Sequence, residues 1–227
     1  DPLSRKGDKS YFNADSGTPI SEFLDEYEPR LREAETADGN FNFITCNHDT
    51  ARVAPRLSQR EIALAYCTLF AMPGVPFLYY GDEIGMRYEH GLLSKEGGYE
   101  RTGSRTPMQW NSRFCAGFSS APPWISLGYS WRAVNVEQEE KDENSVLHFY
   151  RDILAFRKGN PLIRYGTFEL LCADDPHIFA YVRTYQGKRL LVICNFSEKS
   201  QNAAAIYPNP EAIRFHNYPS ITPAVLR

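Results

Sequence analysis

Two short apolar runs in the first half of the chain have the composition of β-strands. Phe41–Cys46 is aromatic and β-branched, and polar residues bound it on both sides. Val75–Tyr80 is almost continuously apolar, as expected of a parallel strand that is buried on both faces. Polar clusters follow both runs, so the pattern places candidate chemistry where two strands end.

The segment between these runs has the pattern of a helix. Apolar residues recur at helical spacing over residues 58–72, and Ser58 with Glu61 forms a capping box at the start. Pro73 and Gly74 end the pattern. Strand, helix and strand in this order predict a βαβ unit with a right-handed crossover.

Two further helical patterns lie on either side of this unit. Thr18 as N-cap and Pro19 at the first helical position predict a helix whose apolar face extends to Leu31. Residues 145–158 form a strong amphipathic pattern, which Gly159 ends. Both patterns predict helices that bury one face against the rest of the chain.

No periodic pattern extends through residues 87–142, where glycine and proline recur. So long a stretch without regular structure inside a compact domain is usually functional. We therefore interpret it as an active-site loop that follows the second strand. We expect Trp110, Trp124 and Trp131 to hold this loop in place.

The hydrophobic period changes to two in the last third of the chain. Residues 166–173, 177–184 and 189–196 have strand patterns that are joined by turn sequences, which predicts an antiparallel meander. The sequence therefore predicts two domains. An α/β domain spans residues 1–160, and an antiparallel β-domain without its final strands spans 161–227.

Composition narrows the class of protein further. The chain has 227 residues, 42% of them hydrophobic, and a net charge of −3, so it can bury a large core and shows no sign of a nucleic-acid partner. No apolar run reaches transmembrane length. The five cysteines are scattered and odd in number, with no recognised metal spacing, so we expect reduced thiols in a cytoplasmic protein. The sequence identifies no metal- or cofactor-binding residues in this chain, and it leaves open a calcium site in the rest of the protein. Nothing in the pattern indicates an oligomeric state.

The polar cluster after the first strand is the main candidate for chemistry. Asn47, His48 and Asp49 place an imidazole beside a carboxylate, and Arg52 follows closely. An arginine can keep a nearby carboxylate ionised, and an ionised carboxylate can stabilise an oxocarbenium-like transition state at a sugar ring. A helix cap or a hydrogen-bonded loop cluster also explains these residues. Taken by themselves, Asn47, His48 and Asp49 favour this structural interpretation over a catalytic one.

Asp82 and Glu83 follow the second strand. Neighbours in a strand point to opposite faces, so these two carboxylates cannot easily serve one bond. We expect one of them to pair with a basic residue inside the fold. A metal site made of His48, Asp49 and Asp82 matches no recognised ligand spacing.

Three polar residues of the long loop leave two interpretations open. Arg101, Arg105 and Gln109 lie in the segment ERTGSRTPMQW. Such a loop can close a site or bind a ligand. It can equally be anchored to the fold through arginine–carboxylate pairs.

Three segments resemble one known family. FITCNHDTARV resembles the segment around barrel strand seven in the alpha-amylase clan of glycoside hydrolases, family thirteen, and GVPFLYYGDEIGM resembles strand eight. GSRTPMQWNSRFCAGFS is similar to the loop after strand eight in alpha-glucosidases, oligo-glucosidases and trehalose synthases of the clan. The resemblance extends from about Phe41 to about Phe196.

The resemblance implies both a fold and an activity. The fold is the C-terminal portion of a (β/α)8 barrel, with strands seven and eight and their helices, followed by a small antiparallel β-sandwich. The activity is that of a retaining alpha-glucosidase or a glucosyl-transferring enzyme on short alpha-glucosides. The clan's nucleophile and acid/base follow strands four and five, and neither motif occurs here, so this chain alone is expected to be inactive.

The resemblance also assigns roles by position. Asp49 matches the carboxylate that stabilises the transition state, and His48 matches the imidazole that binds the same sugar. Arg52 and Arg105 are expected to bind the substrate, an alpha-glucoside oligosaccharide. The alternative is a clan member that has lost catalysis and serves as a carbohydrate-binding or protein-interaction module.

Overall fold

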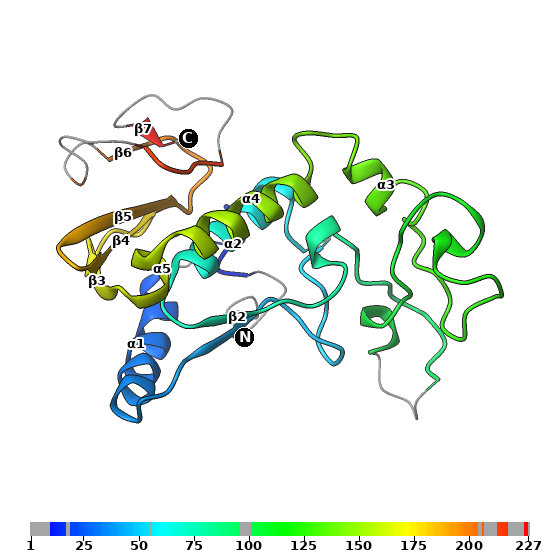
Figure 1. Ribbon diagram of the computed structural model, residues 1–227, viewed down its shortest axis with the longest axis horizontal. Helices are drawn as coiled ribbons and strands as arrows, with labels where there is room; N and C mark the ends of the chain where they lie inside the picture. Colours follow the sequence, from blue (N-terminus) through cyan, green and yellow to red (C-terminus); the bar gives the residue numbers. More distant parts are fainter. Residues whose placement is uncertain are drawn as a thin grey trace. The chain divides into compact units, whose positions relative to one another are not determined.

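The computed structural model describes residues 10–16, 19–54, 56–95, 101–203, 206, 213–217 and 225–226 (Figure 1). The chain groups into two compact units. Unit 1 contains Ile44–Ala63 and Phe77–Asp152, and unit 2 contains Pro2–Phe43, Leu64–Pro76 and Ile153–Arg227.

The described part of the chain alternates helices and strands before it ends in antiparallel strands (Figure 1). The elements are α1 (Ser21–Thr36), β1 (Asn42–Ile44), α2 (Gln59–Ala71), β2 (Val75–Phe77), the 3-10 turns η1 (Asp82–Ile84), η2 (Thr102–Ser104) and η3 (Phe114–Gly117), then α3 (Val136–Glu139), α4 (Val146–Gly159), α5 (Pro161–Tyr165), β3 (Thr167–Leu171), β4 (Ile178–Tyr185), β5 (Lys188–Asn195), β6 (Gln201–Asn202) and β7 (Val225–Leu226).

The predicted strand–helix–strand order is confirmed. β1 and β2 pair in a two-stranded sheet, and α2 connects them. The predicted capping box is present at the start of α2. The backbone N–H of Ser58 donates to Glu61 Oε2 over 2.8 Å, and the N–H of Glu61 donates to Ser58 Oγ over 3.3 Å. Two otherwise unpaired donors are satisfied in this way, which fixes where the helix begins.

α1 begins later than the sequence predicts. Its first residue is Ser21 rather than Pro19, and the N-cap Ile20 makes no side-chain cap bond. The backbone N–H of Glu22 donates to the carbonyl of Pro19, three residues back, over 3.3 Å, whereas the carbonyl of Ile20 already accepts the N–H of Leu24, four residues on, over 3.1 Å. The regular α-helical bonding therefore begins after a tighter turn at Pro19. The predicted N-cap Thr18 lies outside the described residues.

β2 does not have the burial that its apolar sequence predicts. Phe77 is 54% exposed, and Val75, Leu78 and Tyr80 are exposed as well. β1 is the only strand beside β2 among the described residues, so the other edge of β2 has no sheet neighbour there. The prediction of burial on both faces is therefore wrong for this chain, because burial requires a further strand and covering helices.

In unit 2, Arg157 caps the C-terminal end of α2. From α4, its guanidinium donates to the carbonyl oxygens of Phe70, Met72 and Gly74, over 2.5, 3.4 and 2.6 Å. The last carbonyls of a helix have no partner within the helix and carry the negative end of its dipole. A cation at this position therefore satisfies acceptors and stabilises the helix end.

Arg183 of β4 binds the same helix end from the sheet. It donates to the carbonyl of Ala71 over 2.8 Å, and also to Thr167 and Gly166 over 3.0 and 2.7 Å. Burial lowers the pKa of this guanidinium, but arginine keeps its charge in proteins. One side chain thus joins α2, the start of β3 and β4.

The predicted antiparallel meander is confirmed. β3, β4 and β5 lie side by side in chain order, and each neighbouring pair is antiparallel. β4 and β5 are joined at Gln186 and Gly187, which have φ values of 50° and 74°. Positive φ at both positions is the signature of the tight turn whose twist matches two antiparallel strands.

Two of the three tryptophans expected to hold the long loop of unit 1 do not do so, while Trp131 is half-buried. Trp124 is 66% exposed and Trp110 is also exposed, so neither anchors the loop as expected. Gln109 is buried instead, and its amide donates to the carbonyl of Val134 over 2.5 Å. Backbone carbonyls in a segment without regular structure need such partners when they are buried.

All five cysteines are free thiols, as the sequence predicts. No helix in the described part of the chain combines the length and the apolar character needed to cross a membrane.

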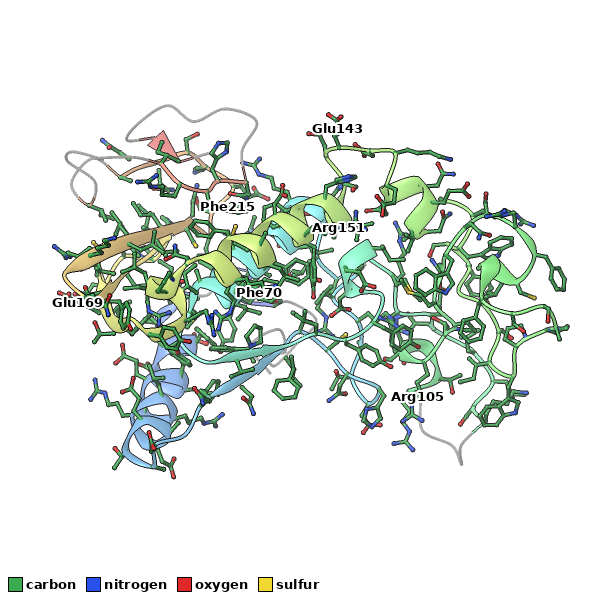
Figure 2. All side chains as sticks on the ribbon, viewed as in Figure 1. Phe70, Arg105, Glu143, Arg151, Glu169 and Phe215 are labelled. Carbon is green, nitrogen blue, oxygen red and sulfur yellow. The ribbon has the colours of Figure 1, made fainter. Side chains whose placement is uncertain are left out.

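Arg183→Met is expected to lower the free energy of unfolding by about 3 kcal/mol, because buried carbonyls lose their charged donor. The measurement is urea denaturation of the full-length protein. Arg151→Met is the matched control, since the exposed Arg151 side chain of α4 (Figure 2) pairs with Glu140 at the end of α3 and such pairs contribute at most about 1 kcal/mol. Equal shifts in the two variants would contradict the capping role.

Candidate active site

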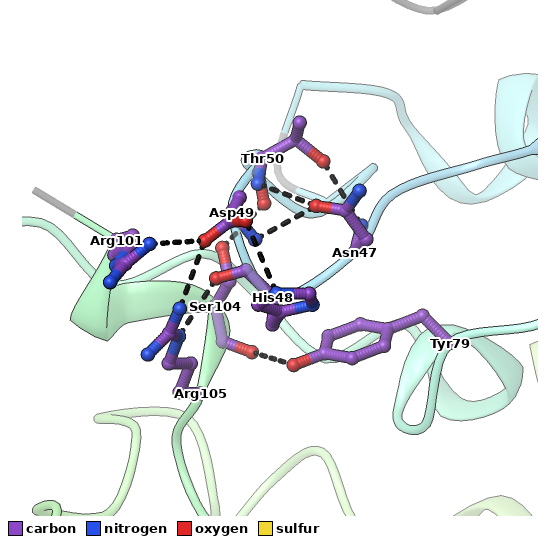
Figure 3. Close-up of polar contacts among 8 residues, drawn as sticks. All are labelled: Asn47, His48, Asp49, Thr50, Tyr79, Arg101, Ser104 and Arg105. Atoms are coloured by element: carbon purple, nitrogen blue, oxygen red, sulfur yellow. Dashed lines mark hydrogen bonds and ion pairs between the residues drawn. The ribbon is translucent and has the colours of Figure 1, made fainter.

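The chain turns sharply where β1 ends, and the turn presents Asp49 (Figure 3). The side-chain oxygen of Asn47 accepts the backbone N–H groups of Asp49 and Thr50, over 2.8 and 3.0 Å. Thr50 Oγ1 accepts the N–H of Asn47 in return, over 3.0 Å. Asparagine side chains favour this local turn because they replace a backbone acceptor. The hydrogen-bonded cluster that the sequence allows is therefore present, and it also fixes the position of the carboxylate.

Three cationic or titratable groups surround the carboxylate of Asp49. Arg101 Nη1 and Arg105 Nη2 lie 2.7 and 2.9 Å from Oδ1, and His48 Nε2 lies 3.1 Å from Oδ2. Arg105 Nε also donates to the backbone carbonyl of His48 over 2.9 Å. The Asp49 side chain nevertheless remains 46% exposed, so solvent or a ligand can reach it.

These neighbours keep Asp49 ionised. Desolvation by itself would raise the pKa of this carboxyl. The hydrogen bond from Arg101, the electrostatic interactions with His48 and Arg101 and the hydrogen bond from Arg105 act in the opposite direction, and the net effect lowers the pKa. The site thus offers an accessible negative charge between positive groups.

Arg52 lies elsewhere than the sequence suggests. Its side chain is 0% exposed, and its guanidinium donates to the carbonyls of Tyr80 and Ser104 over 2.6 and 2.9 Å. Its charge lies 4.9 Å from the centre of the Tyr79 ring and 4.8 Å from that of Tyr80, within the range of cation–π attraction. The arginines beside Asp49 come from the long loop, while Arg52 supports the backbone around the site.

Asp82 is the carboxylate that pairs with Arg52. Its Oδ1 lies 3.7 Å from Arg52 Nη1, and both side chains are fully buried. The hydroxyl of Thr45 and the thiol of Cys46 also donate to it. Burial raises the pKa of Asp82 to about 6, although these partners favour the charged form. The prediction that one residue of the Asp82–Glu83 pair meets a basic residue inside the fold is confirmed.

The structure brings together some of the candidate residues and separates others. His48, Asp49, Arg101 and Arg105 meet at the turn after β1, whereas Gln109 is buried against another part of the loop. The arginine–carboxylate anchoring of the loop, one of the two possibilities open from the sequence, is therefore present. Within the described residues, no group of three His, Cys, Asp or Glu side chains could hold a metal ion.

Sequence reasoning missed Ser104 and Tyr79. Ser104, which lies between Arg101 and Arg105 in the sequence, is fully buried, and Tyr79 donates its hydroxyl to the Ser104 carbonyl over 3.1 Å. Tyr79 lies in the apolar run Val75–Tyr80 and Ser104 in the segment ERTGSRTPMQW, but nothing in either pattern singles out these two side chains. The available signal was their position at the end of the second predicted strand and in the loop that follows it.

Comparison with known protein families covers most of the chain. Residues 18–166 match the alpha-amylase catalytic domain. Residues 168–206 match the C-terminal domain of maltogenic amylase.

Individual relatives agree with these matches. The chain is 35% identical over 188 residues to the oligo-1,6-glucosidase of Parageobacillus thermoglucosidasius, a match that covers 68% of this chain and 34% of that protein. It is 30% identical over 213 residues to the trehalose-6-phosphate hydrolase of Escherichia coli (strain K12), covering 78% of this chain and 38% of the relative. The chain therefore spans little more than a third of the length of such relatives.

Solved structures show the same fold. The trehalose-6-phosphate hydrolase of Bacillus licheniformis superposes with a TM-score of 0.72 at 24% identity, over 91% of this chain and 44% of that one. The isomaltulose synthase of Klebsiella sp. LX3 gives a TM-score of 0.68 at 25% identity, over 81% of this chain and 39% of that one.

The ion pairs of Asp49 make a pH-dependent contribution to stability. Because the folded-state pKa lies below the ordinary value of 3.8, this contribution is present above pH 3.8 and disappears as the pH falls through the lowered pKa. We expect Asp49→Asn to lower the thermal unfolding midpoint at pH 7, and the difference from the wild type to vanish in strong acid. The control is Asp152→Asn on the exposed side of α4. A difference that grows on acidification would contradict the lowered pKa.

Proposed function

The chain belongs to the alpha-amylase family of glycoside hydrolases, and we propose that the whole protein is a retaining alpha-glucosidase or glucosyl-transferring enzyme acting on short alpha-glucosides. Within the family fold, the chain holds barrel strands seven and eight with their helices, followed by the antiparallel C-terminal β-domain. The observation that carries the proposal is the exposed, ionised Asp49 at the end of β1, with His48 and Arg105 beside it.

The relatives support this choice of substrate class. Oligo-1,6-glucosidases and trehalose-6-phosphate hydrolases are among the curated relatives, and isomaltulose and trehalulose synthases are among the solved structures. The names of these proteins refer to hydrolysis as well as to synthesis, and all concern small glucosides. We therefore propose a short alpha-glucoside as the substrate and leave open whether water or a second sugar accepts the glucosyl group.

In the proposed mechanism, Asp49 acts by electrostatics. The glucosyl ring gains positive charge as the glycosidic bond breaks, and a carboxylate already ionised and fixed in place stabilises that charge without reorganisation. His48 and Arg105 are positioned to hydrogen-bond the hydroxyl groups of the same ring. Because these contacts strengthen as the charge develops, they favour the transition state over the bound substrate.

The proposal assigns the nucleophile and the acid/base to residues outside this chain. Double displacement needs both groups in addition to Asp49, so we expect the chain by itself to be inactive. Arg52 has an indirect part in the proposal, because its buried guanidinium contacts the backbone of Tyr80 and Ser104 rather than open space.

Asp49→Asn in the full-length protein is expected to lower kcat on a nitrophenyl alpha-glucoside by about 10²–10³-fold, because a neutral amide cannot stabilise the developing charge. The measurement is the steady-state release of nitrophenol, with Asp152→Asn as the exposed control.

Unchanged turnover in the Asp49 variant would remove the proposed role of this residue. A full-length protein that binds maltose in calorimetry, but hydrolyses and transfers no alpha-glucoside, would instead support a non-catalytic carbohydrate-binding module.

A further inference from the structure

We propose that Ser104 is a positioning residue that sets Arg101 and Arg105 against Asp49. This inference rests on the proposed function, since it concerns the same site. Ser104 is the last residue of η2 and is fully buried; Arg101 directly precedes this 3-10 turn and Arg105 directly follows it (Figure 3).

The side chain of Ser104 joins the loop directly to the turn that presents Asp49. Its hydroxyl donates to the carbonyl of Thr50 over 2.5 Å, and Thr50 is the residue after Asp49. The loop is thus fixed to the backbone that carries the carboxylate, next to the place where its own arginines bind that carboxylate. This hydrogen bond fixes the position of the loop relative to the turn, and it does not depend on the exposed ion pairs.

The backbone carbonyl of Ser104 is also held, by two hydrogen bonds. Its carbonyl accepts one hydrogen bond from Arg52 over 2.9 Å and another from the hydroxyl of Tyr79 over 3.1 Å. A carbonyl oxygen has two lone pairs, so these two donors satisfy it. Arg52 follows β1 and Tyr79 follows β2. Ser104 therefore connects the loop to the ends of both strands.

At Gly103 the turn packs closely against the backbone of Glu89. A Cβ atom at Gly103 would lie 2.1 Å from the carbonyl oxygen of Glu89, so the two backbones are in close contact. The N–H of Glu89 also donates to the carbonyl of Gly103 over 3.4 Å. Within unit 1, the turn is confined between the backbone of Glu89 and the residues that follow β1 and β2.

Such confinement matters because arginine side chains are long and flexible. Arg105 must place Nε on the carbonyl of His48 and Nη2 on Asp49 simultaneously, which requires a fixed position of its own backbone. A displacement of about 1 Å at a catalytic centre can cost about 10²-fold in rate. The arginines also lower the pKa of Asp49, so their position affects the charge that the reaction uses.

The main test is Ser104→Ala in the full-length protein. We expect kcat/KM for a nitrophenyl alpha-glucoside to fall about tenfold, with most of the loss in kcat, because misplacement harms the transition state more than ground-state binding. Ser145→Ala is the matched control, since Ser145 is also a buried serine of unit 1 whose hydroxyl donates to a backbone carbonyl, that of Glu139. We expect this control to change stability but not the kinetic constants.

A double-mutant cycle separates positioning from a purely structural role. If Ser104 acts through Arg105, Ser104→Ala has little further effect on kcat/KM once Arg105→Met has removed the guanidinium. The cycle between Ser145 and Arg105 is expected to be additive. Additive losses in the cycle between Ser104 and Arg105 would overturn the proposal.

Tyr79→Phe provides a second variant that opens no cavity. It removes one of the two donors to the Ser104 carbonyl, and we expect kcat/KM to fall about threefold, in line with the loss of one hydrogen bond. Wild-type kinetics in both the Tyr79 and the Ser104 variants would overturn the proposal while leaving the proposed function intact.

Hydrogen exchange measured by mass spectrometry provides a readout that does not depend on turnover. We expect Ser104→Ala to quicken exchange in residues 101–105 and at the turn over 47–50, and Ser145→Ala to leave both segments unchanged. If the wild type acts on no alpha-glucoside, the proposed function fails. Separately, equal hydrogen exchange in the two serine variants would overturn the positioning role of Ser104.

Discussion

The candidate site depends on the contacts that the buried guanidinium of Arg52 makes. It lies among the segments that follow β1 and β2, donates to the carbonyls of Tyr80 and Ser104, and pairs with the buried carboxylate of Asp82. Transferring a charge from water to a protein interior is costly, so it persists only where hydrogen bonds and an opposite charge offset the desolvation. Here those partners also define the backbone positions around the site.

The exposed part of the site is organised differently. Asp49 remains open to solvent, and the two loop arginines that bind it come from a segment with little regular structure. Exposed ion pairs such as those between the loop arginines and Asp49 contribute little to stability by themselves. The loop therefore also depends on buried polar contacts such as those of Ser104 and Gln109. Buried contacts thus hold the loop in place, while its charged side chains lie on the accessible side.

The apolar surface of β2 is consistent with a chain that covers little more than a third of its relatives. Phe77 and its neighbours have the composition of a buried strand, yet they are exposed in this chain. Burial on both faces is a property of a whole parallel barrel, in which each strand has two neighbours and covering helices. The sequence of β2 is therefore adapted to a larger structure than the described residues form.

The sequence by itself determined the local features. Periodicity and capping residues predicted α2, α4 and the meander of β3, β4 and β5 closely, since each depends on residues near one another in the chain. The same reasoning found His48 and Asp49, because they follow a strand directly. Tertiary structure decided which side chains meet them. The arginines that bind Asp49 lie 52 and 56 positions further along the chain, and no local pattern specifies such a pairing. Only the folded backbone could bury Arg52 and place Ser104 beside Thr50, because these contacts depend on where two strands and a long loop come together.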